Sequence, residues 1–196
     1  MAASRSASPN PFIMASLEAA TESGAHRRIR SHQSSTDVSS ASGTAALLPR
    51  LDGQALVVGT TGDLPMKALS TYARSAAVAI VPNFSVGIPL LLELVQQAVG
   101  QLPPGWDIEV VEAHHHHKQD APSGTAKRIV RATGLEYVPT HSLRVGDTFG
   151  EHTVWLCGPG ERIELKHVAT RREVFAIGAM RWARTLAHAP PGLQQP

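Results

Sequence analysis

The hydrophobic positions of this chain change their spacing several times after residue 45, and each change predicts an element. Short apolar, β-branched runs at residues 56–58 and 78–81 predict strands. Between them, residues 66–77 carry apolar side chains at helical spacing, and Pro65 suits the first turn of a helix. A strand, a helix and a second strand in this order predict parallel strands joined by a crossover helix.

The second half of the chain predicts a different arrangement, in which alternating strands dominate. Ile108 and Val110 alternate with acidic residues, as in a strand with one buried face. The turn Gly158-Pro159-Gly160-Glu161 separates two alternating runs and predicts a β-hairpin. The elements expected here are helices at residues 89–101, 123–132 and 173–186, and strands at 106–112, 152–156 and 162–167.

The first part of the chain has a different composition from the rest. Eleven of residues 1–44 are serines, and the hydrophobic residues among them are isolated. Such a segment cannot bury enough surface to offset the entropy lost on ordering, so residues 1–35 are interpreted as a disordered tail. A plastid transit peptide is the alternative, although the acidic residues Glu18, Glu22 and Asp37 count against it.

Composition narrows the class of protein. The chain has 196 residues, 42 % hydrophobic and 17 % charged, which is typical of globular proteins. No apolar run is long enough for a membrane span, and a net charge of +2 is too small to predict a nucleic-acid partner. The single cysteine, Cys157, excludes an intramolecular disulfide framework. These features leave an ordinary globular protein.

The most informative stretch is residues 112–126, EAHHHHKQDAPSGTA. Four histidines and Lys118 follow a predicted strand, at the position where α/β proteins commonly carry functional loops. Ser123 is a good N-cap for the next helix, whose first N–H groups attract anions. Histidine and lysine together supply positive charge and protons near neutral pH. The pattern therefore predicts a pocket for a carboxylate or phosphate, with an acid beside it.

Two simpler interpretations of the histidine run remain open. The four residues are either a solvated low-complexity tract or part of a metal- or anion-binding module without redox function. In an extended chain only alternate residues share a face, so all four cannot bind one zinc ion without a sharp loop. No cysteine lies nearby to complete a structural zinc site, and we expect no metal.

The same stretch closely resembles the signature of the dihydrodipicolinate reductase (4-hydroxy-tetrahydrodipicolinate reductase) family of lysine and diaminopimelate biosynthesis. It matches the family pattern E-x-H-H-x-x-K-x-D-x-P-S-G-T-A at every fixed place. Four further segments resemble family blocks, and together the resemblance spans about residues 36–190. They are the GTTG loop at 59–62, the NFSVG segment at 83–87, GEH at 150–152 and GERxE at 160–164.

This resemblance implies an α/β fold in two domains. Residues 36–84 would form part of a Rossmann-like dinucleotide-binding domain with a parallel sheet. Residues 85–171 would form an α+β domain with a mixed sheet that binds substrate and oligomerises, giving a homotetramer. Residues 172–196 would contain a helix that returns to the cofactor domain, followed by a tail. The family also implies a cytoplasmic protein.

The resemblance also implies an activity and roles for individual residues. Family members transfer hydride from NADPH or NADH to a cyclic dicarboxylate with loss of water. By motif position, His114 corresponds to the catalytic acid and Lys118 to a second proton donor. The implied substrate-binding residues are His115, Ser123, Gly124 and Thr125. The implied cofactor-binding residues are Gly59, Thr60, Thr61, Val81, Pro82, Asn83 and Phe84.

One family feature has no counterpart in the sequence. The glycine-rich turn that packs a cofactor diphosphate against a helix N-terminus has no match before Gly59. The sequence thus leaves two expectations. One is an active reductase. The other is a catalytically impaired fragment, or the product of a truncated gene model, that retains substrate binding and oligomerisation. The preference between NADPH and NADH is open, because the residue that decides it follows that turn.

Overall fold

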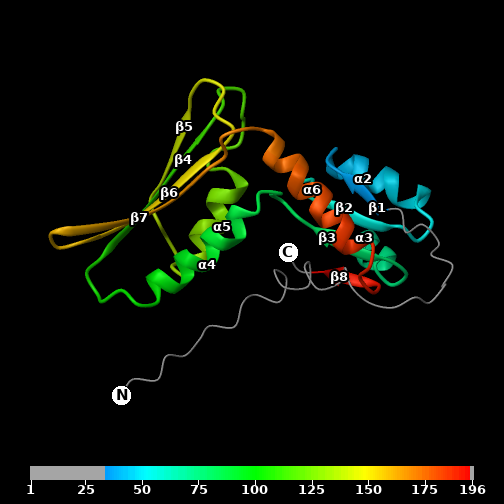
Figure 1. Ribbon diagram of the computed structural model, residues 1–196, viewed down its shortest axis with the longest axis horizontal. Coiled ribbons are helices and arrows are strands. Elements are labelled where there is room, and N and C mark those ends of the chain that lie inside the picture. Colours follow the sequence, from blue (N-terminus) through cyan, green and yellow to red (C-terminus); the bar gives the residue numbers. More distant parts are fainter. Residues whose placement is uncertain (1–33, 195–196) are drawn as a thin grey trace, which may run out of the picture. The chain divides into compact units, whose positions relative to one another are not determined.

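The computed structural model describes residues 34–194, which form two four-stranded sheets with helices packed against them (Figure 1). The first sheet has the order β1-β2-β3-β8, and the second has the order β5-β4-β6-β7. The strands of the first sheet are β1 (Ser34–Asp37), β2 (Ala55–Val58), β3 (Ala77–Ile80) and β8 (Gly192–Gln194). Those of the second are β4 (Asp107–His114), β5 (Thr140–Arg144), β6 (Glu151–Gly158) and β7 (Glu161–Val168). The helices are α2 (Ala41–Leu47), the short η1 (Leu48–Arg50), α3 (Met66–Tyr72), α4 (Gly87–Val99), α5 (Gly124–Ala132) and α6 (Glu173–Leu186).

The first sheet is parallel throughout and is covered on both faces. Successive strand residues point to opposite faces, so Leu56 and Val58 pack toward α3 while Val57 packs toward α6. Burial on both faces explains why the strands consist of continuous apolar runs. Leu69 of α3 and Leu186 of α6 are the buried helix residues on the two sides.

The second sheet is mixed and packs one face against α4 and α5. β4 pairs in parallel with β5 and antiparallel with β6, which pairs antiparallel with β7. Val110 and Val154 contribute to a core with residues of α4 and α5, including Leu91 and Ile129. The opposite face carries half-buried and charged side chains, among them Trp155. The α/β class, with a parallel sheet and a mixed sheet, is thus confirmed.

The beginning of the described region corrects the expected tail at residues 1–35. Ser34 and Ser35 lie in β1, because they pair in parallel with Ala55 and Leu56 of β2. The following turn is held by Asp37, whose carboxylate accepts hydrogen bonds from the Ser39 backbone and hydroxyl and from Thr44. Serine-rich sequence is compatible with order here because its hydroxyls cap the turn and helix α2. Residues 1–33, and with them the transit-peptide alternative, lie outside the described residues.

Besides β1, two further strands were not expected from the sequence. β8 forms within the segment expected to be a tail, where it pairs with β3 in parallel. β5 has the sequence THSLR, whose polar residues hide the alternation typical of a strand, yet it pairs with β4 over five residues. Helix α3 is also shorter than expected and ends at Tyr72. The strands β5 and β8 form because they pair with strands that are distant in the chain, and their local propensity has less influence.

The predicted hairpin and final helix are confirmed. β6 and β7 are joined by a two-residue turn, with Gly158 opposite Glu161. Gly160 in this turn has φ +82°, a conformation that glycine adopts without strain. Helix α6 has the predicted bounds, and its apolar side packs on the first sheet. Within residues 34–194, no helix combines the length and apolar character needed to cross a membrane.

Candidate functional site

Strand β4 places a carboxylate and an imidazole side by side at its carboxyl end. Glu112 and His114 are two residues apart, so both side chains point to the same, buried face of the sheet. Glu112 is fully buried, and His114 is 8 % exposed. Nδ1 of His114 is in hydrogen-bond contact with Oε2 of Glu112. A buried carboxylate needs such partners, because an unpaired buried charge is costly.

Arg144 of β5 provides the countercharge to Glu112. Nη2 of Arg144 donates to Oε1 of Glu112 at 2.9 Å, and Nη1 donates to Oε2 at 3.2 Å. The parallel pairing of β4 and β5 sets His114 opposite Arg144 in the register, which brings the guanidinium to the carboxylate. Burial raises the pKa of Glu112, but hydrogen bonds, foremost from Arg144, outweigh burial and hold the pKa below its ordinary value. Glu112 is therefore ionised at neutral pH.

The ring of His114 is neutral at neutral pH and has a defined tautomer. Burial is the main reason that its pKa lies below the ordinary value, and the contact with Glu112 opposes burial. Since the carboxylate of Glu112 is an acceptor only, Nδ1 of His114 carries the hydrogen and Nε2 is the free ring nitrogen. His114 thus presents Nε2 for chemistry.

The loop that follows β4 brings Lys118 to the same end of the sheet. Its backbone N–H donates to the carbonyl oxygen of His115 at 3.1 Å, and its carbonyl oxygen accepts from Nε of Arg144 at 3.2 Å. The ammonium group lies 2.7 Å from Oδ1 of Asp120 and is partly exposed. Lys118 is therefore a positive charge at the surface of the site, with a backbone that Arg144 holds in place.

Ser123 caps helix α5 and is tied to Glu112. Its hydroxyl oxygen accepts from the Ala126 N–H at 3.1 Å, as the sequence predicted for an N-cap. Its own N–H donates to Oε1 of Glu112 at 3.3 Å. No heavy atom lies within 4 Å of the Cβ position of Gly124, so the backbone of the first helical turn is accessible there. The Ser123-Gly124-Thr125 start therefore lies next to the Glu112–His114 pair.

His152 is a member of this cluster that sequence reasoning did not single out. It lies on β6 opposite Glu112, and its Nε2 lies 3.3 Å from the hydroxyl of Ser123. Its ring is edge-on to that of His114, with centroids 5.2 Å apart. Burial lowers the pKa of His152 to about 4, so the ring is neutral at neutral pH. The only signal for His152 in the sequence is its place in the GEH segment, which resembles a family block but to which no role was assigned.

Arg144 was also not singled out, and the sequence has no local signal for it. It lies in the unpredicted strand β5, and it meets Glu112 only through the pairing of β5 with β4. Glu112 itself belonged to the motif but had no assigned role. His115, by contrast, lies outside the Glu112 network, with its ring 6.3 Å from that of His117 between centroids.

The residues expected to bind a cofactor follow two neighbouring parallel strands. Gly59, Thr60 and Thr61 follow β2, and the segment from Val81 to Phe84, which contains Pro82 and Asn83, follows β3. The carboxyl ends of parallel strands meet at one edge of a sheet, where ligands commonly bind. A Cβ atom on Gly59 would lie 2.4 Å from the ring of Phe84, so glycine is needed for the two segments to meet.

A hydrogen bond links the expected cofactor and substrate segments. Nδ2 of Asn83 donates to Oγ1 of Thr125 at 2.9 Å, and Oδ1 of Asn83 accepts from the Ser85 N–H at 2.8 Å. The hydroxyl of Thr60 is buried with no hydrogen-bond partner among the described residues. The structure therefore brings the segment from Val81 to Phe84 to the start of α5, and it leaves the buried Thr60 hydroxyl after β2 without a hydrogen-bond partner among the described residues.

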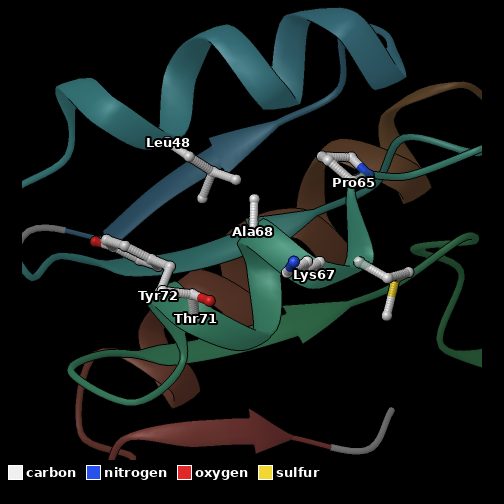
Figure 2. Close-up of a pocket in the computed structure, with 7 residues that line it drawn as sticks. Leu48, Pro65, Lys67, Ala68, Thr71 and Tyr72 are labelled. Atoms are coloured by element: carbon white, nitrogen blue, oxygen red, sulfur yellow. The ribbon is translucent and has the colours of Figure 1, made fainter.

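A cavity elsewhere in the first sheet region has a different character (Figure 2). It has a volume of about 680 Å³ and lies where η1 and α3 adjoin. It is lined by Leu48, Pro65, Met66, Lys67, Ala68, Thr71 and Tyr72. Lys67 is its only titratable group apart from the Tyr72 phenol, whose hydroxyl donates to the Gln54 carbonyl oxygen at 2.6 Å. The chemistry of the molecule is therefore concentrated at β4 and not in this cavity.

The histidines that follow His114 make contacts within their own loop. Across residues 34–194, no three side chains of His, Cys, Asp or Glu are grouped so as to hold a metal ion. The rings of His116 and His117 lie 3.8 Å apart between centroids, and Nδ1 of His116 lies 3.0 Å from the Gly146 carbonyl oxygen. The histidines after His114 therefore belong to a loop with local contacts.

The fold and the site together define an α/β protein with a parallel sheet, a mixed sheet and a cluster of ionisable residues at the end of a mixed-sheet strand. Residues 87–195 match the family described as "Dihydrodipicolinate reductase, C-terminus". The chain belongs to the dihydrodipicolinate reductase family.

Similar proteins agree with this assignment. The chain is 50 % identical over 144 residues to a 4-hydroxy-tetrahydrodipicolinate reductase of Xanthomonas euvesicatoria pv. vesicatoria (strain 85-10), covering 71 % of this chain and 60 % of the relative. It is 45 % identical over 166 residues to the protein of the same name from Anaeromyxobacter dehalogenans (strain 2CP-1 / ATCC BAA-258), covering 72 % and 62 %. The chain thus spans about three fifths of the length of these curated relatives.

A solved structure shares the fold. The dipicolinate-bound dihydrodipicolinate reductase from Paenisporosarcina sp. TG-14 superposes with a TM-score of 0.64 at 22 % identity. The superposition covers 83 % of this chain and 71 % of that one. At this level of identity the likeness supports the two-sheet architecture.

Proposed function

We propose that this chain carries the substrate-binding and proton-transfer site of a 4-hydroxy-tetrahydrodipicolinate reductase. The reaction is the transfer of hydride from NADPH or NADH to a cyclic dicarboxylate with loss of water, in the synthesis of lysine and diaminopimelate. The observation that carries the proposal is that Glu112 contacts both His114 and Ser123, which brings an imidazole and the start of α5 together. The relatives described above carry that activity in their names.

The start of α5 suits a carboxylate of the substrate. The hydroxyls of Ser123 and Thr125 can donate hydrogen bonds, and the N-terminus of α5 adds partial positive charge beside the open space at Gly124. Lys118 adds a full positive charge at the surface of the site. His115 is the further residue proposed to contact a carboxylate. A dianionic ligand thus meets donors and positive charge together.

Proton transfer is assigned to His114 and Lys118. His114 presents Nε2 because Nδ1 is in contact with Glu112, and a protonated Nε2 would be the acid that completes the reduction. Lys118, whose ammonium group lies within reach of solvent and of Asp120, is the second donor. The role of these residues is to orient the substrate and supply protons at defined atoms.

The nicotinamide end of a cofactor fits the residues at the ends of β2 and β3. The buried, unpartnered hydroxyl of Thr60 offers a hydrogen bond, and Gly59 lets the Phe84 ring pack directly against the backbone after β2. The other residues proposed to contact it are Thr61, Val81, Pro82 and Asn83. When bound, the reduced nicotinamide supplies the hydride.

We also propose which part of the chain binds the cofactor and which part binds the substrate. Residues 36–84 and the helix from 172 onward would contribute to cofactor binding, and residues 85–171 would bind substrate.

The face of the second sheet opposite α4 and α5 carries the apolar side chains of Trp155 and Leu143 together with ion pairs. We assign homotetramer assembly to this face. Analytical ultracentrifugation of wild type and Trp155→Glu tests this, and a monomeric wild type contradicts it.

Two measurements test the proposed activity. Calorimetry with pyridine-2,6-dicarboxylate should show binding by wild type and a clear loss of affinity in Lys118→Ala, and equal affinities would contradict the assignment. Turnover with enzymatically made substrate and NADPH or NADH should fall in His114→Ala by about 10²- to 10⁴-fold, the range for a positioned acid. Dicarboxylate binding without turnover in wild type would support the alternative of a chain that retains substrate binding alone.

A further inference from the structure

Arg144 contacts several separate parts of the site, although the motif assigns it no role. Besides the two oxygens of Glu112, its guanidinium donates to the carbonyl oxygens of Lys118, Asp120 and Leu143. Its side chain is 18 % exposed, while that of Glu112 is fully buried. One planar group therefore joins strand β4, strand β5 and the loop that carries Lys118.

We propose that Arg144 is a positioning residue that sets the two proposed proton donors, His114 and Lys118, relative to each other. The inference deepens the proposed function and rests on it. Toward His114, Arg144 acts through Glu112; toward Lys118, it acts through the loop backbone. Neither contact requires Arg144 to touch the substrate.

The first part of the argument concerns the ring of His114. Oε2 of Glu112 receives both Nη1 of Arg144 and Nδ1 of His114. Arg144 keeps the carboxylate ionised and holds it in one orientation, since a bidentate guanidinium–carboxylate pair is geometrically specific. An ionised, fixed Glu112 forces the hydrogen of His114 onto Nδ1, which leaves Nε2 free on the far side of the ring.

Gly150 shows that the space beside Nε2 is kept open. A Cβ atom at position 150 would lie 3.2 Å from Nε2 of His114, which is closer than most contacts that Cβ atoms make in proteins. The residue also has φ +144°, which a side chain rarely permits. The ring orientation that Glu112 imposes thus directs Nε2 into a space that the neighbouring backbone leaves free of side chain.

The second part of the argument concerns the Lys118 loop. Nε of Arg144 donates to the Lys118 carbonyl oxygen at 3.2 Å, and Nη2 donates to that of Asp120. These two carbonyl groups belong to the segment that carries the Lys118 side chain. Arg144 therefore holds this segment at a set place relative to Glu112, and so relative to His114.

The geometry also explains why arginine is required. The acceptors lie around the guanidinium plane and are reached by three different nitrogens. A lysine ammonium is a single point with three donors and cannot reach separated acceptors on both sides. Arg144→Lys keeps the charge that neutralises Glu112 but loses the simultaneous contacts, so it separates positioning from electrostatics.

The test uses the full chain and two independent readouts. Imidazole nitrogen shifts from ¹⁵N NMR report the tautomer of His114, and calorimetry with pyridine-2,6-dicarboxylate reports binding. In wild type we expect the hydrogen of His114 on Nδ1. In Arg144→Lys we expect a mixture of tautomers and an affinity lower by about tenfold, the size of effect seen when a residue that supports a ligand is removed. Arg131→Lys, on an exposed position of α5, is the matched control and should change neither readout.

Two results would overturn the proposal, and a further variant guards against misfolding. A wild-type His114 with its hydrogen on Nε2 contradicts it directly, without any substitution. So does an Arg144→Lys protein with wild-type tautomer and affinity. If Arg144→Lys does not fold, Glu112→Gln replaces it, and the proposal requires the same loss of a single tautomer there. Failure of wild type to bind the dicarboxylate refutes the proposed function instead, because the tautomer readout does not depend on binding.

Discussion

Asn83 and Thr125, which lie 42 positions apart in the chain, are joined by a hydrogen bond of 2.9 Å from Nδ2 to Oγ1. The first residue belongs to the segment after β3 that we propose contacts the cofactor. The second belongs to the start of α5 that we propose holds a substrate carboxylate. One side-chain contact therefore connects the two halves of the proposed active site.

We predict that this hydrogen bond is measurable as a coupling energy. A double-mutant cycle of Asn83→Ala and Thr125→Val in urea unfolding should give an interaction of about 1 kcal/mol, the typical net value of an intramolecular hydrogen bond. Pairing Asn83→Ala with Thr133→Val, at the other end of α5, is the control and should give additive effects. Additivity at Asn83 and Thr125 as well would show that the contact contributes nothing to stability.

The buried His152 should make the protein sensitive to mild acid. Its pKa is about 4 in the folded state, against an ordinary value of 6.5, because the ring is buried. Between these values the unfolded chain binds a proton that the folded chain does not, so stability falls as pH drops from 6.5 toward 4. The full effect is roughly 3 kcal/mol, from about 1.4 kcal/mol for each unit of pKa difference.

Urea unfolding at several pH values between 7 and 4.5 checks this. The unfolding free energy of wild type should fall more steeply with acid than that of His152→Gln, which has no imidazole at this position. His188→Gln, at an exposed position after α6, should follow wild type. Parallel curves for wild type and His152→Gln would mean that His152 protonates equally easily in both states.

The pH profile of turnover should have a descending limb, on its high-pH side, that belongs to His114. Burial holds the pKa of His114 below 6.5, so its protonated, proton-donating form is lost as pH rises through that lowered value. We therefore expect kcat/KM, which reports groups of the free enzyme, to decline with rising pH in a range below 6.5. The limb should persist in Lys118→Gln, and His114→Gln should abolish it. A limb that persists in His114→Gln would assign the acid to another group.

Helix α6 should tolerate no side chain at Gly178. A Cβ atom there would lie 1.8 Å from the carbonyl oxygen of Phe84, so the helix packs directly on the backbone of the segment after β3. We predict that Gly178→Ala lowers the unfolding free energy by about 2 kcal/mol, within the range for overpacking. The measurement is urea unfolding, with Gly124→Ala as the control because nothing lies within 4 Å of its Cβ position. Equal stability of the two variants would show that α6 can shift without cost.

The sequence by itself determined the class of fold, the family and the motif that contains the site. Local patterns carry this information: the apolar runs of β2 and β3, the glycine turn between β6 and β7, and the Ser123 cap are all short-range features. Residues 112–126 contain His114, Lys118 and Ser123 in one stretch, so a single motif shows them together.

Only the tertiary structure decided which residues complete the site. Arg144 and His152 reach Glu112 and Ser123 through the pairing of β5 and β6 with β4, and such pairing depends on strand register. The unpredicted strands β5 and β8 have little pattern of their own and are ordered by their partners. The state of His114 likewise depends on burial and on Arg144, since a pKa reflects surroundings assembled from distant segments.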